Sequence, residues 1–448
     1  MTATRPSVGL LRQPGPPALA PGARDMPGSA PAGHSAPSGL AEGRVTPAAA
    51  VGRKRVMLFA NTDWYLYNFR RSLATALRDA GHDVLLVSPP GDYGPQLEAR
   101  GLRWIPAPMD RRSLNPLKEL ALVDWLRRLI LREQVDLVHG FTIKCAIYGS
   151  MAARLSRRAV RVNAVAGMGY VFTSDAPKAR VLRPIVRSLM RAALDGPGSR
   201  LILQNPDDVA LFARAHIVDP ERVRLIKGSG VDCARFSPSA GRPRRPSEAA
   251  GASGDARPSD LRGQRFRVLL PARLLWDKGL AEYVEAARML KAAGREIDFL
   301  IAGEPDRCNP ASVPEATVHG WVEAGLVQWL GQVRDMPALF GAVDAVALPS
   351  YREGLPKGLI EAAASQLPLV TTNVPGCREV VEDGVDGLLV PARDAPALAR
   401  AIARLQDDPL LRERLARGAR ARAVAEFDER IVIERTMAVY RELLPGIA

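Results

Sequence analysis

Short apolar runs recur along most of the chain, and a polar loop and then a segment with helical spacing of its apolar positions commonly follow each run. A continuous apolar run of this length predicts a strand that is buried on both faces, and apolar positions three and four apart predict an amphipathic helix. In the first half, strands are predicted at residues 56–60, 83–88, 102–106, 136–139, 161–164, 200–204 and 223–226. Helices are predicted at residues 69–80, 94–100, 117–133 and 145–155, and residues 61–68 are predicted to form a loop.

The same alternation begins again at Phe266 and continues to the last helix. Strands are predicted there at residues 266–272, 297–303, 327–330, 342–348 and 368–371. Helices are predicted at residues 280–293, 336–340, 357–364, 395–405, 409–426 and 429–443. Strands that alternate with helices at this spacing indicate βαβ units and parallel sheets. The sequence therefore predicts an α/β protein with two doubly wound, Rossmann-like domains of similar size.

Two segments lack any apolar period and are rich in Pro, Gly, Ala, Ser or Arg. This composition predicts a disordered extension at residues 1–54 and a linker with a disordered insert at residues 233–265. The first domain is then predicted at residues 55–232 and the second at residues 266–428. A return of the terminal helix, residues 429–445, onto the first domain is compatible with this division.

The net charge of +14 is unevenly distributed over the 448 residues. Residues 56–230 carry 26 basic and 16 acidic residues, a net charge of +10, whereas residues 266–448 carry 22 and 26, a net charge of −4. A basic first half is suited to an anionic membrane or to nucleic acid. Residues 178–194 alternate basic and apolar residues at helical spacing, which fits either a helix on anionic lipid headgroups or an ordinary amphipathic helix with a solvated basic face. Basic residues are not clustered with aromatic ones, so a nucleic-acid-binding function ranks last.

The apolar runs are all too short to span a bilayer, and the four cysteines lie far apart without metal-ligand spacing. These features predict a cytoplasmic protein in a reducing compartment, without an integral membrane segment. No phosphate-binding P-loop motif is present, and no G-x-G-x-x-G motif follows the first strand of either half. The use of NAD is therefore disfavoured.

The most informative stretch is LPSYREGLPKGLIE, which spans residues 348–361. It combines the end of a predicted strand, a loop that contains Glu353, and a helix that begins at Lys357. A helix N-terminus favours a phosphate group, so Glu353 ahead of the helix would face a sugar on that phosphate, and Glu361 would lie near a ribose. The simpler interpretation is that Glu353 is a loop charge and that Glu361 pairs with Lys357.

Other candidate residues follow predicted strands, at the edge where ligands bind in parallel sheets. Arg273 and Lys278 lie after the first strand of the second half and would neutralise a diphosphate. Asn61 and His139 each end a predicted strand of the first half, although a loop histidine packed against its neighbours is the simpler interpretation of His139. In QNPDD, residues 204–208, capping of a helix explains the two aspartates better than a metal site does.

Taken together, these residues resemble the GT-B nucleotide-sugar glycosyltransferases of glycosyltransferase family 4, over most of residues 55–445. The resemblance is specific as an ordered set, although each motif alone is weak. It rests on HGFTIK (139–144), NAVAGMGYVF (163–172), QNPDD (204–208), GSGVD (228–232), RLLWDKG (273–279), PSYREGLPKGLIEAAA (349–364) and NVPGCREVVEDGVDGLLVP (373–391).

The resemblance implies a role for each candidate residue. Arg273 and Lys278 look like the pair that binds the donor diphosphate, Glu353 like the acid that contacts the donor sugar, and Glu361 like the residue that holds the ribose hydroxyls. His139 resembles the cleft histidine of the acceptor domain, close to the donor sugar, which with Glu353 implies a catalytic role. Asn61 and Lys144 are placed on the acceptor side. The backbone amides of Lys357, Gly358, Leu359 and Ile360 would lie over the diphosphate.

Members of this family transfer a sugar with retention of its anomeric configuration and need neither a cofactor nor a catalytic metal. One departure is visible, because many members have a Gly-rich loop after the first strand, where this chain has Asn61-Thr62-Asp63-Trp64 followed by YNFR. The pattern looks most like bacterial transferases that act on undecaprenyl-diphosphate-linked saccharides in lipopolysaccharide or capsule synthesis.

The resemblance implies a UDP-sugar as donor, with an N-acetylhexosamine or a hexose as the transferred sugar. It also implies a lipid-linked saccharide as acceptor and peripheral contact with the anionic inner face of the cytoplasmic membrane. A soluble acceptor, or a GDP- or ADP-sugar as donor, stays open as an alternative.

Overall fold

The computed structural model describes residues 52–111, 113, 115–165, 177–238, 265–306 and 309–447. The disorder predicted for residues 1–51 and 239–264 lies outside the described residues, as do Cys308 and most of NAVAGMGYVF.

The described chain forms two sheets in which all strands are parallel. The first sheet has the order β3-β2-β1-β4-β5-β6-β7, and the second has the order β10-β9-β8-β11-β12-β13. The first contains β1 (Arg55–Phe59), β2 (Asp83–Ser88), β3 (Arg103–Pro106), β4 (Leu137–Phe141), β5 (Val160–Val165), β6 (Ser199–Leu203) and β7 (Val223–Leu225). The second contains β8 (Phe266–Pro271), β9 (Ile297–Ala302), β10 (Gln328–Trp329), β11 (Ala345–Leu348), β12 (Leu369–Thr372) and β13 (Leu388–Val390). The predicted pair of doubly wound α/β domains is confirmed.

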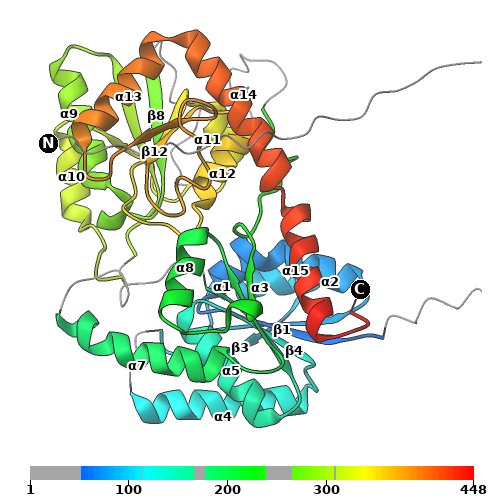
Figure 1. Ribbon diagram of the computed structural model, residues 1–448. Helices are drawn as coiled ribbons and strands as arrows, with labels where there is room; N and C mark the ends of the chain where they lie inside the picture. The colour runs from blue at the N-terminus through cyan, green and yellow to red at the C-terminus, as the bar shows by residue number, and fades with distance from the viewer. Residues whose placement is uncertain are drawn as a thin grey trace, which may run out of the picture. The chain divides into compact units, whose positions relative to one another are not determined.

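Helices connect the strands of both sheets (Figure 1). Those around the first sheet are α1 (Asp63–Tyr65), η1 (Leu66–Arg70), α2 (Arg71–Asp79), α3 (Gly94–Glu98), α4 (Pro116–Arg132), α5 (Ile143–Ser156), α7 (Pro177–Leu194), α8 (Pro206–Arg214) and η2 (Pro220–Arg222). Those that follow are η4 (Trp276–Lys278), α9 (Leu280–Ala292), α10 (Glu315–Glu323), α11 (Met336–Gly341), α12 (Lys357–Ala364), α13 (Ala395–Asp407), α14 (Pro409–Glu426) and α15 (Glu429–Leu443).

Strand β1 shows how the alternation of side chains builds the core on both faces of a sheet. Val56 and Leu58 pack into one apolar cluster with residues of α2 and α15, whereas Met57 and Phe59 pack into another with residues of α4 and α5. Successive side chains of a strand point to opposite faces, and a parallel sheet is covered on both. This is why the strands read as continuous apolar runs in the sequence.

The chain crosses between the two sheets twice, and the two crossings pair with each other. Val231 N donates to Phe427 O at 2.9 Å, and Glu429 N donates to Val231 O at 3.0 Å. Gly230 has a φ of +74°, and a Cβ there would lie 2.4 Å from the Cα of Glu429, so this contact requires glycine. Beyond the crossing, α15 packs beside α2 on the first sheet through Val432, Met437 and other apolar residues (Figure 1).

Three sequence predictions are corrected by the fold. Residues 61–68 are not a loop, because α1 and the π-helical turn η1 occupy Asp63–Arg70, and the Thr62 hydroxyl caps their start by accepting from Tyr65 N at 3.1 Å. Strand β4 does not end at His139 but continues to Phe141, which pairs with Ala164 of β5. Helix α10 and strand β13 were not predicted, since β13 has only three residues and α10 lacks a clear apolar face.

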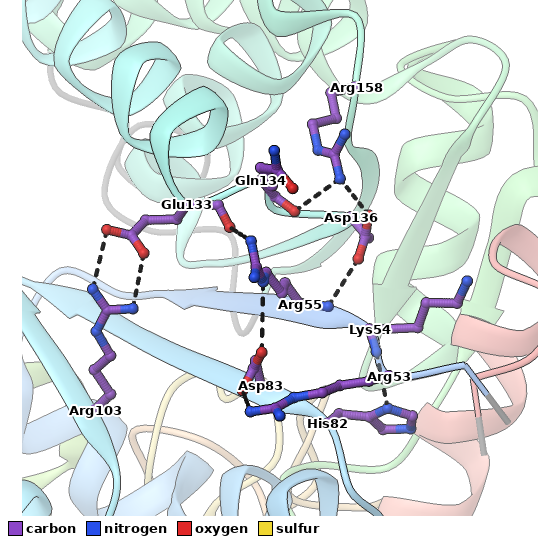
Figure 2. Close-up of polar contacts among 10 residues, drawn as sticks. All are labelled: Arg53, Lys54, Arg55, His82, Asp83, Arg103, Glu133, Gln134, Asp136 and Arg158. Carbon is purple, nitrogen blue, oxygen red and sulfur yellow. Dashed lines mark hydrogen bonds and ion pairs between the residues drawn. The ribbon is translucent and has the colours of Figure 1, made fainter.

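Polar contacts join the amino ends of the first strands (Figure 2). Asp136 accepts from Arg55 N at 2.9 Å and from Arg158 at 3.1 Å, and Glu133 accepts two hydrogen bonds from Arg103 at 2.8 and 3.0 Å. Asp83 pairs with Arg53. This edge is the one opposite to the carboxyl ends of the strands.

Candidate functional site

The candidate donor site lies at the carboxyl edge of the second sheet, between β8 and β11. The strand order reverses at this pair, and ligands bind at such switch points in doubly wound sheets. Arg273 lies two residues after the end of β8, Lys278 ends η4, and Glu353 lies in the loop between β11 and α12. Gly279 has a φ of +74°, and a Cβ there would lie 2.1 Å from Pro349 O, so glycine lets η4 approach the end of β11. The fold therefore brings Lys278 and Glu353 together.

Glu353 is held by contacts on several sides. Its Oε1 atom forms an ion pair with Lys278 and accepts a hydrogen bond from Ser350 Oγ at 2.6 Å. Its backbone N donates to Pro375 O at 3.0 Å, and its side chain is only 10% exposed. The other oxygen, Oε2, accepts no hydrogen bond from the described residues. A carboxylate fixed in this way has one oxygen left for a ligand.

The other proposed donor-site residues also pair with opposite charges. Arg273, which is 50% exposed, forms an ion pair with Asp306 at 2.7 Å. Lys357 Nζ lies 3.8 Å from Glu361 Oε1 and donates to the backbone O of Asn68 at 2.5 Å. Burial lowers the pKa of Lys357 and raises the pKa of Glu361. The pairing of Lys357 with Glu361 that the sequence suggested is therefore present.

The start of α12 lies against the end of β8. A Cβ at Gly358 would be 2.8 Å from Pro271 O, so glycine permits this close approach. Pro356 provides no side-chain hydrogen bond to cap the helix, whereas the N–H groups of Leu359 and Ile360 bond to Pro356 O at 3.1 and 3.3 Å. The amides of Leu359 and Ile360 are thus already bonded, and among the described residues the first turn of α12 offers the N–H groups of Lys357 and Gly358 and a partial positive charge near the end of β8.

His139 lies within β4 and is 1% exposed, so it is a buried strand residue and not a loop residue. Its Nδ1 atom lies 2.6 Å from the hydroxyl of Tyr440 on α15, and its Nε2 atom is buried without a partner among the described residues. Burial and the nearby charge of Arg70 hold the pKa of His139 well below its usual value. Burial therefore favours the neutral form of the imidazole.

The two acceptor-side candidates differ in their surroundings. Asn61 follows β1 directly, next to β4 at the switch point of the first sheet, and is half-buried. Lys144 donates to Asp110 O at 2.7 Å and to Ser113 O at 3.1 Å, and it forms an ion pair with Glu119 at 2.9 Å. Lys144 therefore ties the start of α5 to the loop before α4.

Sequence reasoning missed how the second domain contacts the start of α8. Asn205 caps α8 as predicted for QNPDD, because its side chain accepts from Asp208 N at 2.8 Å. Asp207 and Asp208 also form ion pairs with Arg378 and Arg352. No group of three or more potential metal ligands was found among the described residues. Nothing in the sequence pattern indicates these pairs, because the partners lie more than 140 positions apart.

Two cavities lie elsewhere in the described part of the chain and are alternatives to this site. One of about 430 Å³ lies at the amino edge of the first sheet and is lined by residues that include Arg55, Arg103 and Glu133. These lining charges are already paired with each other or with backbone oxygens (Figure 2). A second cavity, of about 60 Å³, lies between the two sheets and is lined by residues that include Tyr65 and Lys357. The second adjoins the candidate donor site through Lys357.

Two family models match the two halves of the chain. Residues 68–228 match the family described as "Glycosyl transferase 4-like domain", and residues 265–408 match the family described as "Glycosyl transferases group 1".

Relatives with known names match most of the chain. The chain is 27% identical over 399 residues to the N,N'-diacetylbacillosaminyl-diphospho-undecaprenol alpha-1,3-N-acetylgalactosaminyltransferase of Campylobacter jejuni, covering 88% of this chain and 100% of that protein. It is 26% identical over 304 residues to the UDP-Gal:alpha-D-GlcNAc-diphosphoundecaprenol alpha-1,3-galactosyltransferase of Escherichia coli, covering 67% of this chain and 74% of that protein.

Solved structures share the fold. A glycosyltransferase from Rickettsia africae superimposes with a TM-score of 0.68 at 18% identity, over 88% of this chain and 99% of that one. Anabaena Alr3699/HepE in complex with UDP superimposes with a TM-score of 0.68 at 20% identity, over 87% of this chain and 100% of that one.

Proposed function

Because the chain belongs to glycosyltransferase family 4 and has the GT-B fold, we propose that it transfers a sugar from a UDP-sugar to a lipid-linked saccharide with retention of configuration. The observation that carries this proposal is the ion pair of Lys278 and Glu353 at the carboxyl edge of the second sheet, where Glu353 lies in the loop that leads into α12. We propose residues 266–428 as the nucleotide-sugar-binding domain and residues 55–232, joined by α15, as the acceptor-binding domain.

In the proposed mechanism, the donor diphosphate lies at the first turn of α12, between Arg273 and Lys278. Lys278 would then exchange Glu353 for the diphosphate, and Glu353 would turn to a hydroxyl of the donor sugar. Cations and amides aimed at the leaving diphosphate stabilise the negative charge that develops on it. The acceptor hydroxyl attacks the anomeric carbon from the same face, its proton passes to the departing diphosphate, and the C–O bond to that diphosphate breaks.

The nature of the acceptor is proposed from the named relatives, whose names refer to undecaprenol-linked sugars. A polyprenyl diphosphate is anionic and is held in a membrane, so an enzyme that acts on it needs a surface for lipid headgroups. No helix in the described part of the chain is both long and apolar enough to cross a bilayer. We therefore propose peripheral contact with the inner face of the cytoplasmic membrane.

Helix α7 offers a surface suited to this contact. Val181, Ile185 and Leu189 form a stripe at four-residue spacing and are 68%, 54% and 42% exposed. Arg187 and Arg191 of the same helix are also exposed. Exposed apolar residues beside basic ones are typical of helices that lie in the headgroup region. Helices α7 and α4 both pack against α5, and Leu117 and Leu120 at the start of α4 are exposed as well (Figure 1).

Replacement of Val181, Ile185 and Leu189 together by serine should weaken vesicle binding, because the apolar stripe could no longer enter the headgroup region. Co-sedimentation with phosphatidylglycerol-containing vesicles is expected to fall about 10-fold or more, since each buried apolar side chain contributes roughly 1.5–3 kcal/mol. Serine at Val322 and Leu410, two exposed apolar residues of the second domain, serves as the control. If the two variants bound vesicles equally well, the membrane contact of α7 would be contradicted, and α7 would be an ordinary amphipathic helix.

A thermal-unfolding panel with UDP, GDP, ADP and their common sugars tests the donor. UDP at about 100 times its dissociation constant should stabilise the folded protein by about 2.7 kcal/mol. The shift should be greatly reduced in Arg273→Ala and in Lys278→Ala, because each removes a cation next to the diphosphate. Arg288→Ala is the control, since Arg288 pairs with Glu285 on the surface of α9. If only GDP or ADP raised the melting temperature, the donor would carry guanine or adenine and not uracil. If no nucleotide raised it, the proposed donor site would be wrong.

A further inference from the structure

The loop that carries Glu353 is held from the other domain at both residues next to Glu353. On one side, the guanidinium of Arg352 forms an ion pair with Asp208. On the other side, Asn205 Nδ2 donates to the backbone O of Gly354 at 2.9 Å. Both partners belong to the start of α8, which follows β6 of the first sheet. The two contacts therefore bracket the proposed sugar-binding acid.

The α8 side of these contacts is buried, whereas the side chain of Arg352 is 29% exposed. Asn205 is fully buried and Asp208 is 1% exposed. Asn205 accepts from Asp208 N at 2.8 Å through Oδ1 and donates to Asp208 Oδ2 at 2.9 Å through Nδ2. One amide thus caps the helix, orients the carboxylate and reaches the loop of the other domain. Loss of one partner from such a buried network leaves a desolvated polar group unpaired, which is costly.

On the premise of the proposed function, we propose that Asn205 and Asp208 are positioning residues that hold Glu353 in its productive place across the domain boundary. The loop between β11 and α12 has no regular structure of its own around Glu353. Its other restraints come from the second domain and include the contacts of Glu353 with Lys278, Pro375 and Gly376. The loop is therefore restrained from both domains, and the geometry of Glu353 depends on their contact.

The chain contains a matched control for this proposal. Asp207, next to Asp208 on the same helix turn, pairs with Arg378 at 2.6 Å. The side chains of Asp207 and Arg378 are each about one third exposed, and neither residue is next to Glu353 in the chain. Exposed ion pairs contribute little because water screens them. A general effect of interdomain ion pairs would appear in both aspartates, whereas positioning of Glu353 would appear only in Asp208.

The test measures UDP release from UDP-galactose and UDP-N-acetylgalactosamine with an undecaprenyl-diphosphate-linked N-acetylhexosamine acceptor in detergent. Asp208→Asn and Asn205→Ser are each expected to lower kcat about 10-fold with little change in donor KM, because misplacement of a catalytic group by about 1 Å can cost up to 100-fold. Asp207→Asn should stay within about twofold of the unchanged protein. Serine is a good N-cap but is too short to reach Gly354, so Asn205→Ser keeps α8 capped and carries the test if Asp208→Asn unfolds.

A second arm repeats Asp208→Asn and Asn205→Ser in a Glu353→Gln background. If they act through Glu353, they should cause no further fall in kcat there, whereas a purely structural role gives an additive fall. Equal effects of Asp207→Asn and Asp208→Asn, or additive effects in the Glu353→Gln background, would overturn the inference. If Glu353→Gln itself left kcat unchanged, the proposed function of the site would fail instead.

Discussion

Arg273→Ala is expected to lower kcat about 100- to 1,000-fold, which is the usual effect of removing one group that stabilises developing negative charge. Arg273 lies two residues after β8, whose last residue, Pro271, contacts Gly358 in the first turn of α12, and its guanidinium can offer two donors to a diphosphate. Without a ligand, Arg273 pairs with Asp306, and the Arg273 side chain is half exposed. The measurement is the rate of UDP release in the same acceptor assay as above.

The protein should stay folded when Arg273 is removed, because a partly exposed ion pair contributes roughly 0–1 kcal/mol. Its melting temperature should therefore differ little from that of Arg288→Ala, in which another exposed arginine with a carboxylate partner is replaced. A near-normal kcat in Arg273→Ala would show that the diphosphate is bound elsewhere. A lowered melting temperature with lowered activity would indicate that the arginine supports the fold.

Glu353→Gln is expected to lower kcat about 100-fold without lowering the affinity for UDP, because the loss of the Glu353 charge leaves Lys278 free for the diphosphate. A hydrogen bond to a charged group contributes roughly 1.5–3 kcal/mol, and glutamine keeps the shape of the side chain but loses its charge. The effect should appear with the sugar nucleotide and not with UDP alone, since Glu353 is proposed to contact the sugar. UDP release and a UDP titration by thermal unfolding measure the two quantities.

Glu285→Gln, at an exposed carboxylate on α9, is the control for the loss of one negative charge. A lowered affinity for UDP in Glu353→Gln would indicate that Glu353 contacts the nucleotide and not the sugar. Unchanged turnover would leave Glu353 as the structural partner of Lys278, which is the simpler interpretation that its ion pair allows.

The charge balance of the site gives both predictions a common basis. Arg273, Lys278 and Lys357 each have a carboxylate partner, namely Asp306, Glu353 and Glu361. A diphosphate that enters must therefore replace carboxylates, and the acid released by Lys278 is the one proposed to meet the donor sugar. Binding of the nucleotide and orientation of the sugar would then be linked through one ion pair.

The sequence by itself determined the fold class, most of the element order and a set of candidate donor-site residues. Buried parallel strands must be apolar on both faces, so they read as short apolar runs, and helices between them show their own spacing. Helices α12, α14 and α15 begin and end where the sequence predicts, because Pro356, Asp408 and Asp428 mark their starts. Candidate residues that follow strands were found for the same reason, since carboxyl ends of parallel strands share one edge.

Only the tertiary structure decided which charges pair and which residues meet. Asp208 with Arg352, Asn205 with Gly354, and His139 with Tyr440 are joined over more than 140 positions. The helical start at Asp63–Arg70 was also decided by context, where Asp63 accepts from the backbone of Tyr93 and Gly94. Periodicity and local propensity report on neighbours a few residues apart, whereas long-range contacts depend on how the elements pack in space. The sequence therefore named the candidate site residues, and the packing of two domains around them decided their partners.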